Sequence, residues 1–172
     1  GEDSVQASGR PAPVSSFQVI DDLLRSLDDR KRLPILAGIV LAGHSGGGQL
    51  VQRYAVLNPV DGPLRRDGIA IRYVIANPSS YLYLTHERPR PDGKGYAPYE
   101  RGICPTYNQY KYGTDKLPAY AQETDDTRLF IRYAERDVTY LLGGADNNPE
   151  HRLLDKTCGA EAQGATRLAR GA

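Results

Sequence analysis

A glycine-rich turn that follows a run of apolar residues constrains this chain more than any other feature. Residues 35–42 are apolar or glycine, and residues 43–47 read Gly-His-Ser-Gly-Gly, which is a G-x-S-x-G sequence. Residues 49–57 then carry a helix-like pattern of apolar side chains. In a strand–turn–helix context this motif is typical of a serine held on a sharp, strained turn with its hydroxyl exposed. We therefore interpret Ser45 as a nucleophile, and expect the first and last glycines of the motif to prevent side chains from colliding across the turn.

The same turn has two other interpretations. A G-x-S-x-G sequence also occurs by chance in a tight loop, and a glycine-rich turn between a strand and a helix can cradle a phosphate. A phosphate-binding loop has a lysine and then a serine or threonine after its glycines. Residues 48–50 are Gly-Gln-Leu and supply neither. The nucleophile interpretation is therefore favoured.

The length and charge of the chain limit its roles. A chain of 172 residues is long enough for one domain with a substantial core. Its net charge of +1, with 25% charged residues, argues against nucleic-acid or membrane-surface binding driven by bulk charge. No apolar run approaches the length of a membrane span, and no signal peptide is visible at Gly1. Because the chain has no methionine, even at its first position, and stops abruptly at Ala172, we expect a piece of a longer polypeptide.

Helix and strand patterns alternate along the chain. After a polar stretch expected to be a loop (residues 1–13), a helix is predicted over residues 15–32, with Ser15 as its N-cap and Gln18 completing a capping box. Strands are predicted over residues 35–42, 69–76 and 137–142, and a last helix over residues 160–170. Since both faces of the first strand are apolar, we expect it to be a central strand of a parallel sheet. The order of the elements predicts an α/β fold with part of a doubly wound parallel sheet.

Eight of the twelve tyrosines lie in residues 79–120, the tyrosine-rich segment between the second and third predicted strands. A connection this long is usually either functional or disordered. Its aromatic rings carry apolar area worth burying, which argues against disorder. Two interpretations remain open for this insertion: a cap that lines the substrate site, or a structural flap packed by its own rings.

The cysteines and histidines form no metal-binding pattern. Cys104 and Cys158 are too few and too far apart for a zinc site, and His44, His86 and His151 lack ligand spacing. We expect neither a metal nor a cofactor. The cysteines could remain buried thiols or form a disulfide that clamps the tyrosine-rich segment to the region after the third strand. The disulfide is favoured, and it would place the protein in an oxidising compartment, extracellular or periplasmic.

Asp146 is the candidate for the acid of a catalytic triad. A serine nucleophile needs a base, usually histidine, which an acid orients, and G-x-S-x-G enzymes carry them in the order serine, acid, histidine. Asp146 lies in a glycine-rich turn after the third predicted strand, where open α/β sheets place ligand-facing residues. The alternative is an ordinary turn aspartate before Asn-Asn-Pro. Asp137, at the other end of that strand, and Asp155, in a predicted helix, are weaker candidates.

These features together resemble the α/β-hydrolase superfamily, from the helix at Ser15, through the G-x-S-x-G turn, to the glycine-rich turn at residues 143–146. Three further stretches are similar to a bacterial or fungal branch of uncharacterised, secreted-type hydrolases. They are Asn-Pro-Ser-Ser-Tyr at residues 77–81, Cys-Pro-x-Tyr-Asn at residues 104–108, and Cys158 followed by Ala-Gln-Gly at residues 162–164.

The resemblance implies a role for each candidate residue. It implies Ser45 as the nucleophile, Asp146 as the acid, and the backbone N–H of Gly46 as one donor of the oxyanion hole. The expected activity is that of a serine hydrolase, which cleaves carboxylic esters or related acyl bonds of a small-molecule or acyl-ester substrate through an acyl-enzyme. An acyltransferase could use the same nucleophile, and a non-catalytic module of this fold could instead bind partners through the tyrosine-rich segment. The oligomeric state is not indicated.

The chain departs from the family pattern in two places. The family's second oxyanion donor comes from a loop after an early strand, and this sequence has no counterpart of it. The family's histidine follows a further strand after the acid, whereas here the residues after Asp146 are predicted to be helical. His151 lies close after Asp146 and is a weak candidate for the base. We therefore expect residues 1–172 to be the central and late part of one hydrolase domain, inactive by itself.

Overall fold

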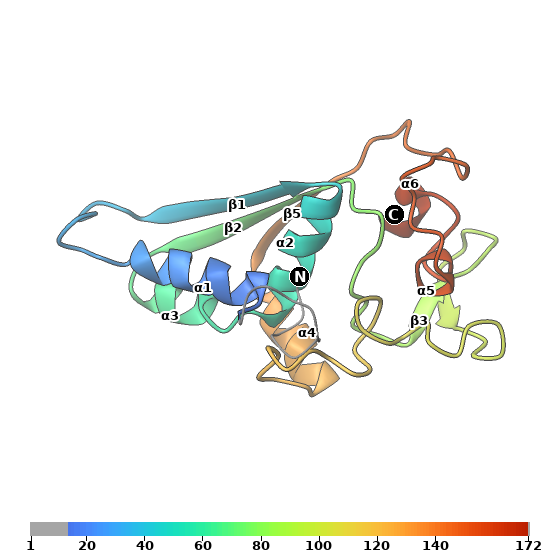
Figure 1. The fold of residues 1–172 in the computed structure, drawn as a ribbon, viewed down its shortest axis with the longest axis horizontal. Helices are drawn as coiled ribbons and strands as arrows, with labels where there is room; N and C mark the ends of the chain where they lie inside the picture. Colours follow the sequence, from blue (N-terminus) through green and yellow to red (C-terminus); the bar gives the residue numbers. More distant parts are fainter. Residues whose placement is uncertain (1–13, 172) are drawn as a thin grey trace.

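A three-stranded parallel sheet forms the centre of the computed structural model, which describes residues 14–171 (Figure 1). The strands are β1 (Gly38–His44), β2 (Ala70–Ala76) and β5 (Asp137–Leu141), in the order β1-β2-β5. The parallel α/β class expected from the sequence is therefore present. The loop expected at residues 1–13 lies outside the described residues.

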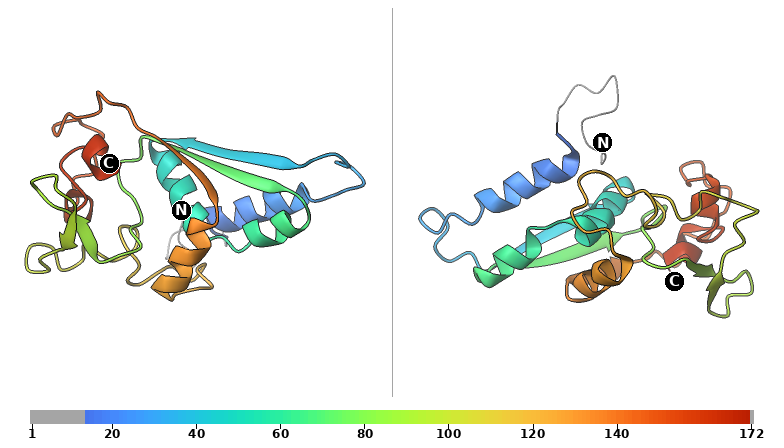
Figure 2. Two further views of the ribbon diagram at one scale, coloured as in Figure 1. Left: turned by 180° about the vertical axis from the view of Figure 1, so that it is seen from behind. Right: turned by 90° about the horizontal axis from the view of Figure 1, so that it is seen from below.

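Four helices cover one face of this sheet (Figures 1 and 2). They are α1 (Ser16–Ser26), α2 (Gly46–Leu57), α3 (Asp61–Arg66) and α4 (Asp126–Ala134). A smaller lobe lies beyond the sheet and holds the antiparallel pair β3 (Glu87–Pro89) and β4 (Tyr96–Pro98), and the short helices α5 (Cys158–Glu161) and α6 (Arg167–Gly171). No helix within residues 14–171 is long and apolar enough to cross a membrane.

Helix α1 begins where the sequence predicts but ends earlier. The capping box is confirmed: Ser15 Oγ accepts the backbone N–H of Gln18 (3.1 Å), and Gln18 Oε1 accepts the backbone N–H of Ser15 (2.7 Å). The prediction that the helix reaches residue 32 is wrong, because it ends at Ser26. Asp29 explains the early end, since its carboxylate accepts the backbone N–H groups of the two residues that follow Arg30 and so favours a turn.

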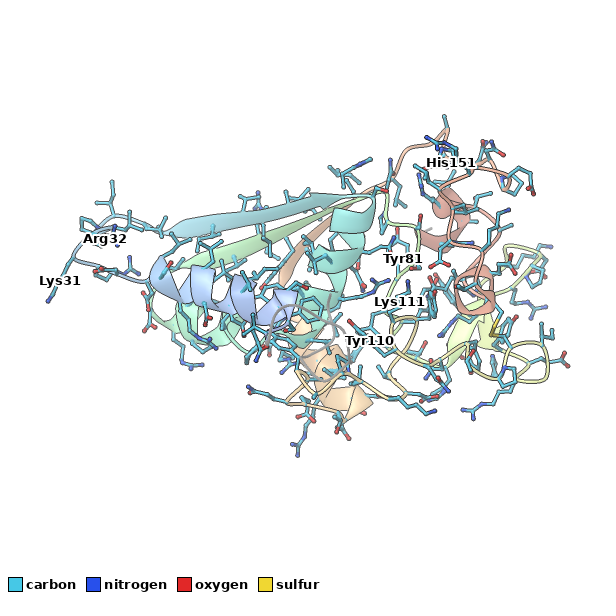
Figure 3. All side chains as sticks on the ribbon, in the orientation of Figure 1. Lys31, Arg32, Tyr81, Tyr110, Lys111 and His151 are labelled. Atoms are coloured by element: carbon cyan, nitrogen blue, oxygen red, sulfur yellow. A yellow bond between two sulfur atoms is a disulfide. The ribbon has the colours of Figure 1, made fainter. Side chains whose placement is uncertain are left out.

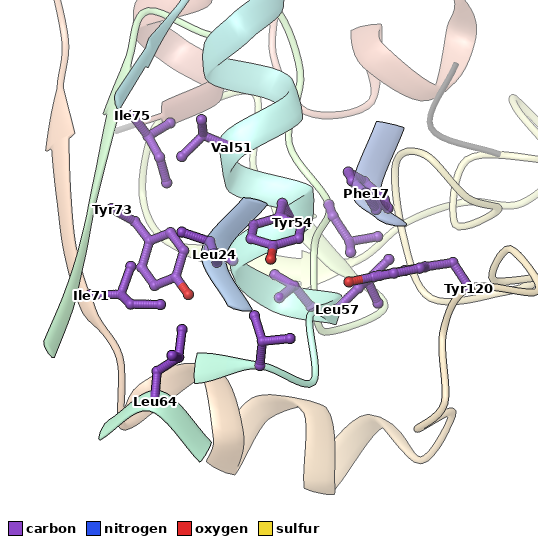
Figure 4. Close-up of a cluster of buried hydrophobic side chains, with 14 of the residues drawn as sticks. Phe17, Leu24, Val51, Tyr54, Leu57, Leu64, Ile71, Tyr73, Ile75 and Tyr120 are labelled. Atoms are coloured by element: carbon purple, nitrogen blue, oxygen red, sulfur yellow. The ribbon is translucent and has the colours of Figure 1, made fainter. Parts of the chain in front are cut away.

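The core lies between the sheet and its helices (Figure 4). Its buried side chains come from every helix that covers the sheet and from β2, and include Phe17, Leu24, Val51, Leu57, Leu64, Ile71, Tyr73, Ile75 and Leu129. Two tyrosines of this core share one acceptor, because the hydroxyls of Tyr54 (2.7 Å) and Tyr120 (2.9 Å) both donate to Asp21 Oδ1. This carboxylate therefore joins α1, α2 and the end of the tyrosine-rich segment.

Replacing Asp21 with alanine is expected to lower the free energy of unfolding by about 2–4 kcal/mol, because two buried hydroxyls lose their acceptor. Asp22→Ala is the matched control: this neighbour on α1 has a side chain that is 79% exposed, and its loss should cost less than about 0.5 kcal/mol. Urea unfolding of both variants of the full-length protein measures the difference. Equal losses for the two variants would contradict the role of Asp21.

Strand β1 differs from its prediction in extent and in surroundings. It begins at Gly38 rather than at residue 35, and Ile35 is 92% exposed. The prediction of a central strand is wrong for the described residues, where β1 is an edge of the sheet and β2 is the centre. Val40 is 64% exposed, so the face of the sheet opposite the helices is open within residues 14–171.

The single helix predicted over residues 160–170 is also wrong, since the structure has two short helices, α5 and α6, in its place. Gly164 lies between them with a φ of 139°, a backbone conformation that a helix does not contain. Thr166 then starts α6, because its hydroxyl accepts the backbone N–H of Ala169 (3.1 Å).

The predicted disulfide between Cys104 and Cys158 is present and ties the tyrosine-rich segment to α5. Closing a loop of 54 residues contributes about 2–4 kcal/mol to stability if it acts mainly on the unfolded chain. Arg88 holds the same lobe from inside, because its buried guanidinium donates to the backbone carbonyls of Thr85, Tyr107 and Tyr112. Burial lowers the pKa of Arg88 to about 10, so it remains charged at neutral pH.

Candidate active site

Ser45 occupies the turn between β1 and α2 in a strained backbone conformation. Its φ is 56° and its ψ is −117°, a region that residues with a side chain rarely adopt. The surrounding backbone holds it there: the Ser45 N–H donates to the carbonyl of Ala76 (2.9 Å), and its own carbonyl accepts the N–H of Gln49 (3.0 Å). The strand–turn–helix context expected for the motif is therefore present around this serine.

The glycines around Ser45 have different roles. A Cβ built on Gly43 would approach the backbone of Gly47 closer than 3.0 Å, as expected for a tight turn. A Cβ on Gly47 itself would meet nothing within 4 Å, so the expected need for glycine there does not hold. Sequence analysis missed Gly48, where a Cβ would lie 2.7 Å from the carbonyl oxygen of Ala76. Glycine is therefore required at 43 and 48, where the turn packs on itself and on the end of β2.

Gly46 is the first residue of α2, directly after Ser45. The first N–H groups of a helix have no acceptor within it, and they lie at its positive end. The backbone N–H of Gly46 is therefore placed beside the serine in an environment that favours negative charge.

The three parallel strands end at the same edge of the sheet. His44 pairs with Ala76, and Ala76 pairs with Leu141, so the residues after these strands follow one another across that edge. Asn77 stands in the middle with a φ of 42°; its N–H donates to the carbonyl of Leu141 (2.9 Å), and its Oδ1 accepts the N–H of Gly143 (2.6 Å). The sequence analysis assigns Asn77 only to the Asn-Pro-Ser-Ser-Tyr stretch after the strand, although asparagine before proline is a known signal for a special turn.

Asp146 lies in the turn after β5, on the same edge as Ser45. Its backbone N–H donates to the carbonyl of Gly143 (2.9 Å), and its side chain is 18% exposed. The carboxylate pairs with Arg167, at 3.3 Å between Oδ2 and Nη1. Two elements distant in sequence, the turn after β5 and the start of α6, are therefore joined at the candidate acid.

The two weaker aspartates have other partners. Asp137 pairs with Arg72 (2.8 Å) at the start of β5, the opposite end of the sheet from Ser45. Asp155 lies in the smaller lobe and accepts the hydroxyl of Tyr112 (2.9 Å). Burial opposes the ionisation of Asp155, but hydrogen bonds from Thr157 and Tyr112 outweigh it and hold its pKa below the usual range.

Of the three histidines, His44 directly precedes Ser45 in the chain, and the other two interact with other groups. His151 is on the loop beside the C-terminal helices (Figure 3), and its Nδ1 accepts the backbone N–H of Leu153 (3.2 Å). His86 lies 4.0 Å from Asp126 of α4, and His44 ends β1. Within residues 14–171 no histidine hydrogen-bonds to the candidate nucleophile or acid, and no group of three acidic, cysteine or histidine side chains could hold a metal.

A cavity of about 310 Å³ opens between β5, α2, α4 and the tyrosine-rich segment. It is lined by the rings of Tyr81, Tyr83, Tyr96, Tyr133 and Tyr140, by apolar side chains, and by the polar side chains of Gln52, Thr85 and Arg170. Neither Ser45 nor Asp146 lines it. Burial raises the pKa of Tyr81, Tyr83 and Tyr133 above its ordinary value, so these phenols stay protonated. The tyrosine-rich segment thus packs its own rings and also forms one wall of a cavity.

No protein-family model and no curated protein matches this sequence. The solved structures that resemble the fold include two enzymes. Poly(aspartic acid) hydrolase-1 from Sphingomonas sp. KT-1 shares 28% identity and has a TM-score of 0.59, over 94% of this chain and 48% of that chain. LpqC, a poly(3-hydroxybutyrate) depolymerase from Bordetella parapertussis, shares 22% identity and has a TM-score of 0.55, over 91% of this chain and 41% of that chain.

The likeness to these two enzymes supports a fold of the α/β-hydrolase type. This chain spans less than half of the length of either solved chain.

Proposed function

We propose that this protein is a serine hydrolase that cleaves acyl bonds through a covalent acyl-enzyme. The observation that carries the proposal is the backbone of Ser45, which has a φ of 56° on a turn between a parallel strand and a helix. Holding a residue with a side chain in this region costs about 1–3 kcal/mol, and such strain is concentrated at functional sites. A turn needed only for chain reversal could use glycine without that cost.

In the proposed reaction the Ser45 hydroxyl attacks the carbonyl carbon of the substrate as a histidine base removes its proton. The negative charge that develops on the carbonyl oxygen is stabilised by the backbone N–H of Gly46, at the positive end of α2. Collapse of the intermediate expels the leaving group, which takes the proton from the histidine, and leaves an ester on Ser45. Water then hydrolyses this ester by the same steps, while Asp146 orients the histidine.

The chemistry of the two solved relatives supports the acyl class. One hydrolyses poly(aspartic acid), whose units are joined by amide bonds, and the other depolymerises poly(3-hydroxybutyrate), whose units are joined by ester bonds. Both bonds present a carbonyl carbon to a nucleophile, which is the step that a serine on a sharp turn performs. Carboxylic esters are the better first substrates to test, because their leaving groups depart more readily than amines.

We also propose that residues 14–171 belong to a larger hydrolase domain, which supplies the histidine base and a second oxyanion donor. The open face of the sheet beside Val40 and the partial coverage of both solved chains support this. The tyrosine-rich segment would act as a cap in that domain; the 310 Å³ cavity that it lines includes neither Ser45 nor Asp146 in its wall. The disulfide supports a site of action outside the cell or in the periplasm.

A non-catalytic binding module of the same fold is the second candidate. It is favoured by one observation: within residues 14–171 no histidine side chain hydrogen-bonds to Ser45 or Asp146. The tyrosine-rich segment would then be the surface that binds a partner. An acyltransferase would share the nucleophile with the hydrolase and differ only in accepting an alcohol or amine in place of water.

Labelling of the full-length protein with a fluorophosphonate separates the first two candidates. These reagents react with a serine only where a base and an oxyanion hole activate it. The hydrolase predicts one label per chain, located at Ser45 by peptide mapping and lost after heat unfolding. Ser80, which is fully buried, serves as the internal control and should stay unlabelled. An unlabelled protein would favour the binding module.

A further inference from the structure

Arg167 contacts three separate segments of the chain around the candidate acid. It lies at the start of α6 and is only 8% exposed. Its Nη1 pairs with Asp146 Oδ2 (3.3 Å), its Nε donates to Ser79 Oγ (2.9 Å), and its Nη2 donates to the carbonyl of Leu153 (3.2 Å). One planar guanidinium thus joins the loop after β2, the turn after β5 and the loop before α5.

The backbone next to Arg167 also holds the candidate acid. The N–H of Leu168 donates to the carbonyl oxygen of Asp146 (3.1 Å). The start of α6 therefore fixes Asp146 at two points, one on its main chain and one on Oδ2. The other carboxylate oxygen, Oδ1, accepts no hydrogen bond from the residues that the structure describes.

We propose that Arg167 is a positioning residue for the catalytic acid, an inference that rests on the proposed function. By holding Oδ2, Arg167 sets the plane and the rotamer of the Asp146 carboxylate and directs Oδ1 to the N–H of the histidine base. An acid that turns away leaves the imidazole in the wrong orientation, and small displacements of catalytic groups cost about 10²-fold in rate. The rigid fork of arginine suits this task, whereas a lysine ammonium could not hold three partners in one plane.

Arg136 provides a matched control away from the site. It is 8% exposed, as Arg167 is, and donates to the carbonyl of Asn58 (2.7 Å). It directly precedes β5, at the opposite end of that strand from the turn that carries Asp146. If Arg167 were only a buried arginine that holds neighbouring loops together, loss of Arg167 and loss of Arg136 would have similar consequences.

The test measures kcat and KM of the full-length protein for a fluorogenic ester. Arg167→Gln is expected to lower kcat by about 10–100-fold with KM changed less than about threefold. Arg136→Gln is expected to lower the unfolding temperature but change kcat by less than about threefold. Arg167→Lys keeps the positive charge and should disturb the fold less than Arg167→Gln. It should lower kcat by about tenfold, and it tests the inference if the glutamine variant does not fold.

A double-mutant cycle with Asp146→Asn separates positioning from a structural role. Because Arg167 acts through Asp146, Arg167→Gln should lower kcat by less than about twofold when Asp146 is already asparagine. The Arg136→Gln effect should be the same in both backgrounds. Losses that simply multiply for Arg167, or an Arg167→Gln variant with full kcat, would overturn the inference. Ester hydrolysis that survives Ser45→Ala would instead overturn the proposed function, so the two failures are distinguishable.

Discussion

Ser45→Ala is expected to remove ester hydrolysis by the full-length protein, with kcat falling by at least about 10⁴-fold, because no other group can form the acyl-enzyme. The fold should be unaffected. Alanine keeps the Cβ of serine, and Ser45 is held through its backbone N–H and carbonyl, which alanine retains. The unfolding temperature should therefore change by less than about 2 °C.

The measurement is the initial rate with a small chromogenic ester, before and after the substitution. Ser26→Ala is the matched control, since Ser26 lies at the exposed end of α1 and its hydroxyl donates only to the carbonyl of Leu23. That variant should keep full activity. Undiminished hydrolysis by Ser45→Ala would end the assignment of Ser45 as the nucleophile and would require another group to attack the ester.

The features that the sequence predicts well are set by local chemistry. The capping box at Ser15 and Gln18 needs only residues three apart, and the strand–turn–helix around Ser45 needs a contiguous stretch. The parallel order of the strands follows from the alternation of elements, because consecutive parallel strands need a crossover. The carboxyl ends of these strands therefore lie at one edge of the sheet, and the turn that carries Asp146 follows the end of β5.

The features that sequence analysis misses depend on contacts between distant segments. The need for glycine at position 48 comes from the carbonyl of Ala76 at the end of β2, and no pattern around the motif contains that information. The pairing of Asp146 with Arg167 requires α6 to begin at residue 167, whereas the helical pattern predicted one helix from residue 160. Helix α4 was also missed, although Asp125 is an N-cap whose side chain accepts the N–H of Arg128 (2.9 Å).

Gly43→Ala and Gly47→Ala are expected to have opposite effects, although both replace a glycine of the same motif. A Cβ at position 43 would overlap the backbone of Gly47, and backbone yields less easily than the end of a side chain. Relieving the overlap would move Ser45 and the start of α2, at a cost of about 3 kcal/mol in stability. Fluorophosphonate labelling should slow by more than about 100-fold, because the serine would leave its position beside the N–H of Gly46.

Gly47→Ala should instead stabilise the protein by about 0.5–1 kcal/mol, because the new methyl group meets open space and alanine loses less backbone entropy in a helix. Gly48→Ala should resemble Gly43→Ala, since its Cβ would lie 2.7 Å from the carbonyl oxygen of Ala76.

Urea unfolding and the labelling rate of the three full-length variants test this order of effects. If Gly47→Ala were as damaging as Gly43→Ala, the space beside Gly47 would have to be filled in the full-length protein. If all three variants matched the parent protein in stability and in labelling rate, the reactivity of Ser45 would not depend on the tight turn. The strained backbone of Ser45 would then no longer support a catalytic role.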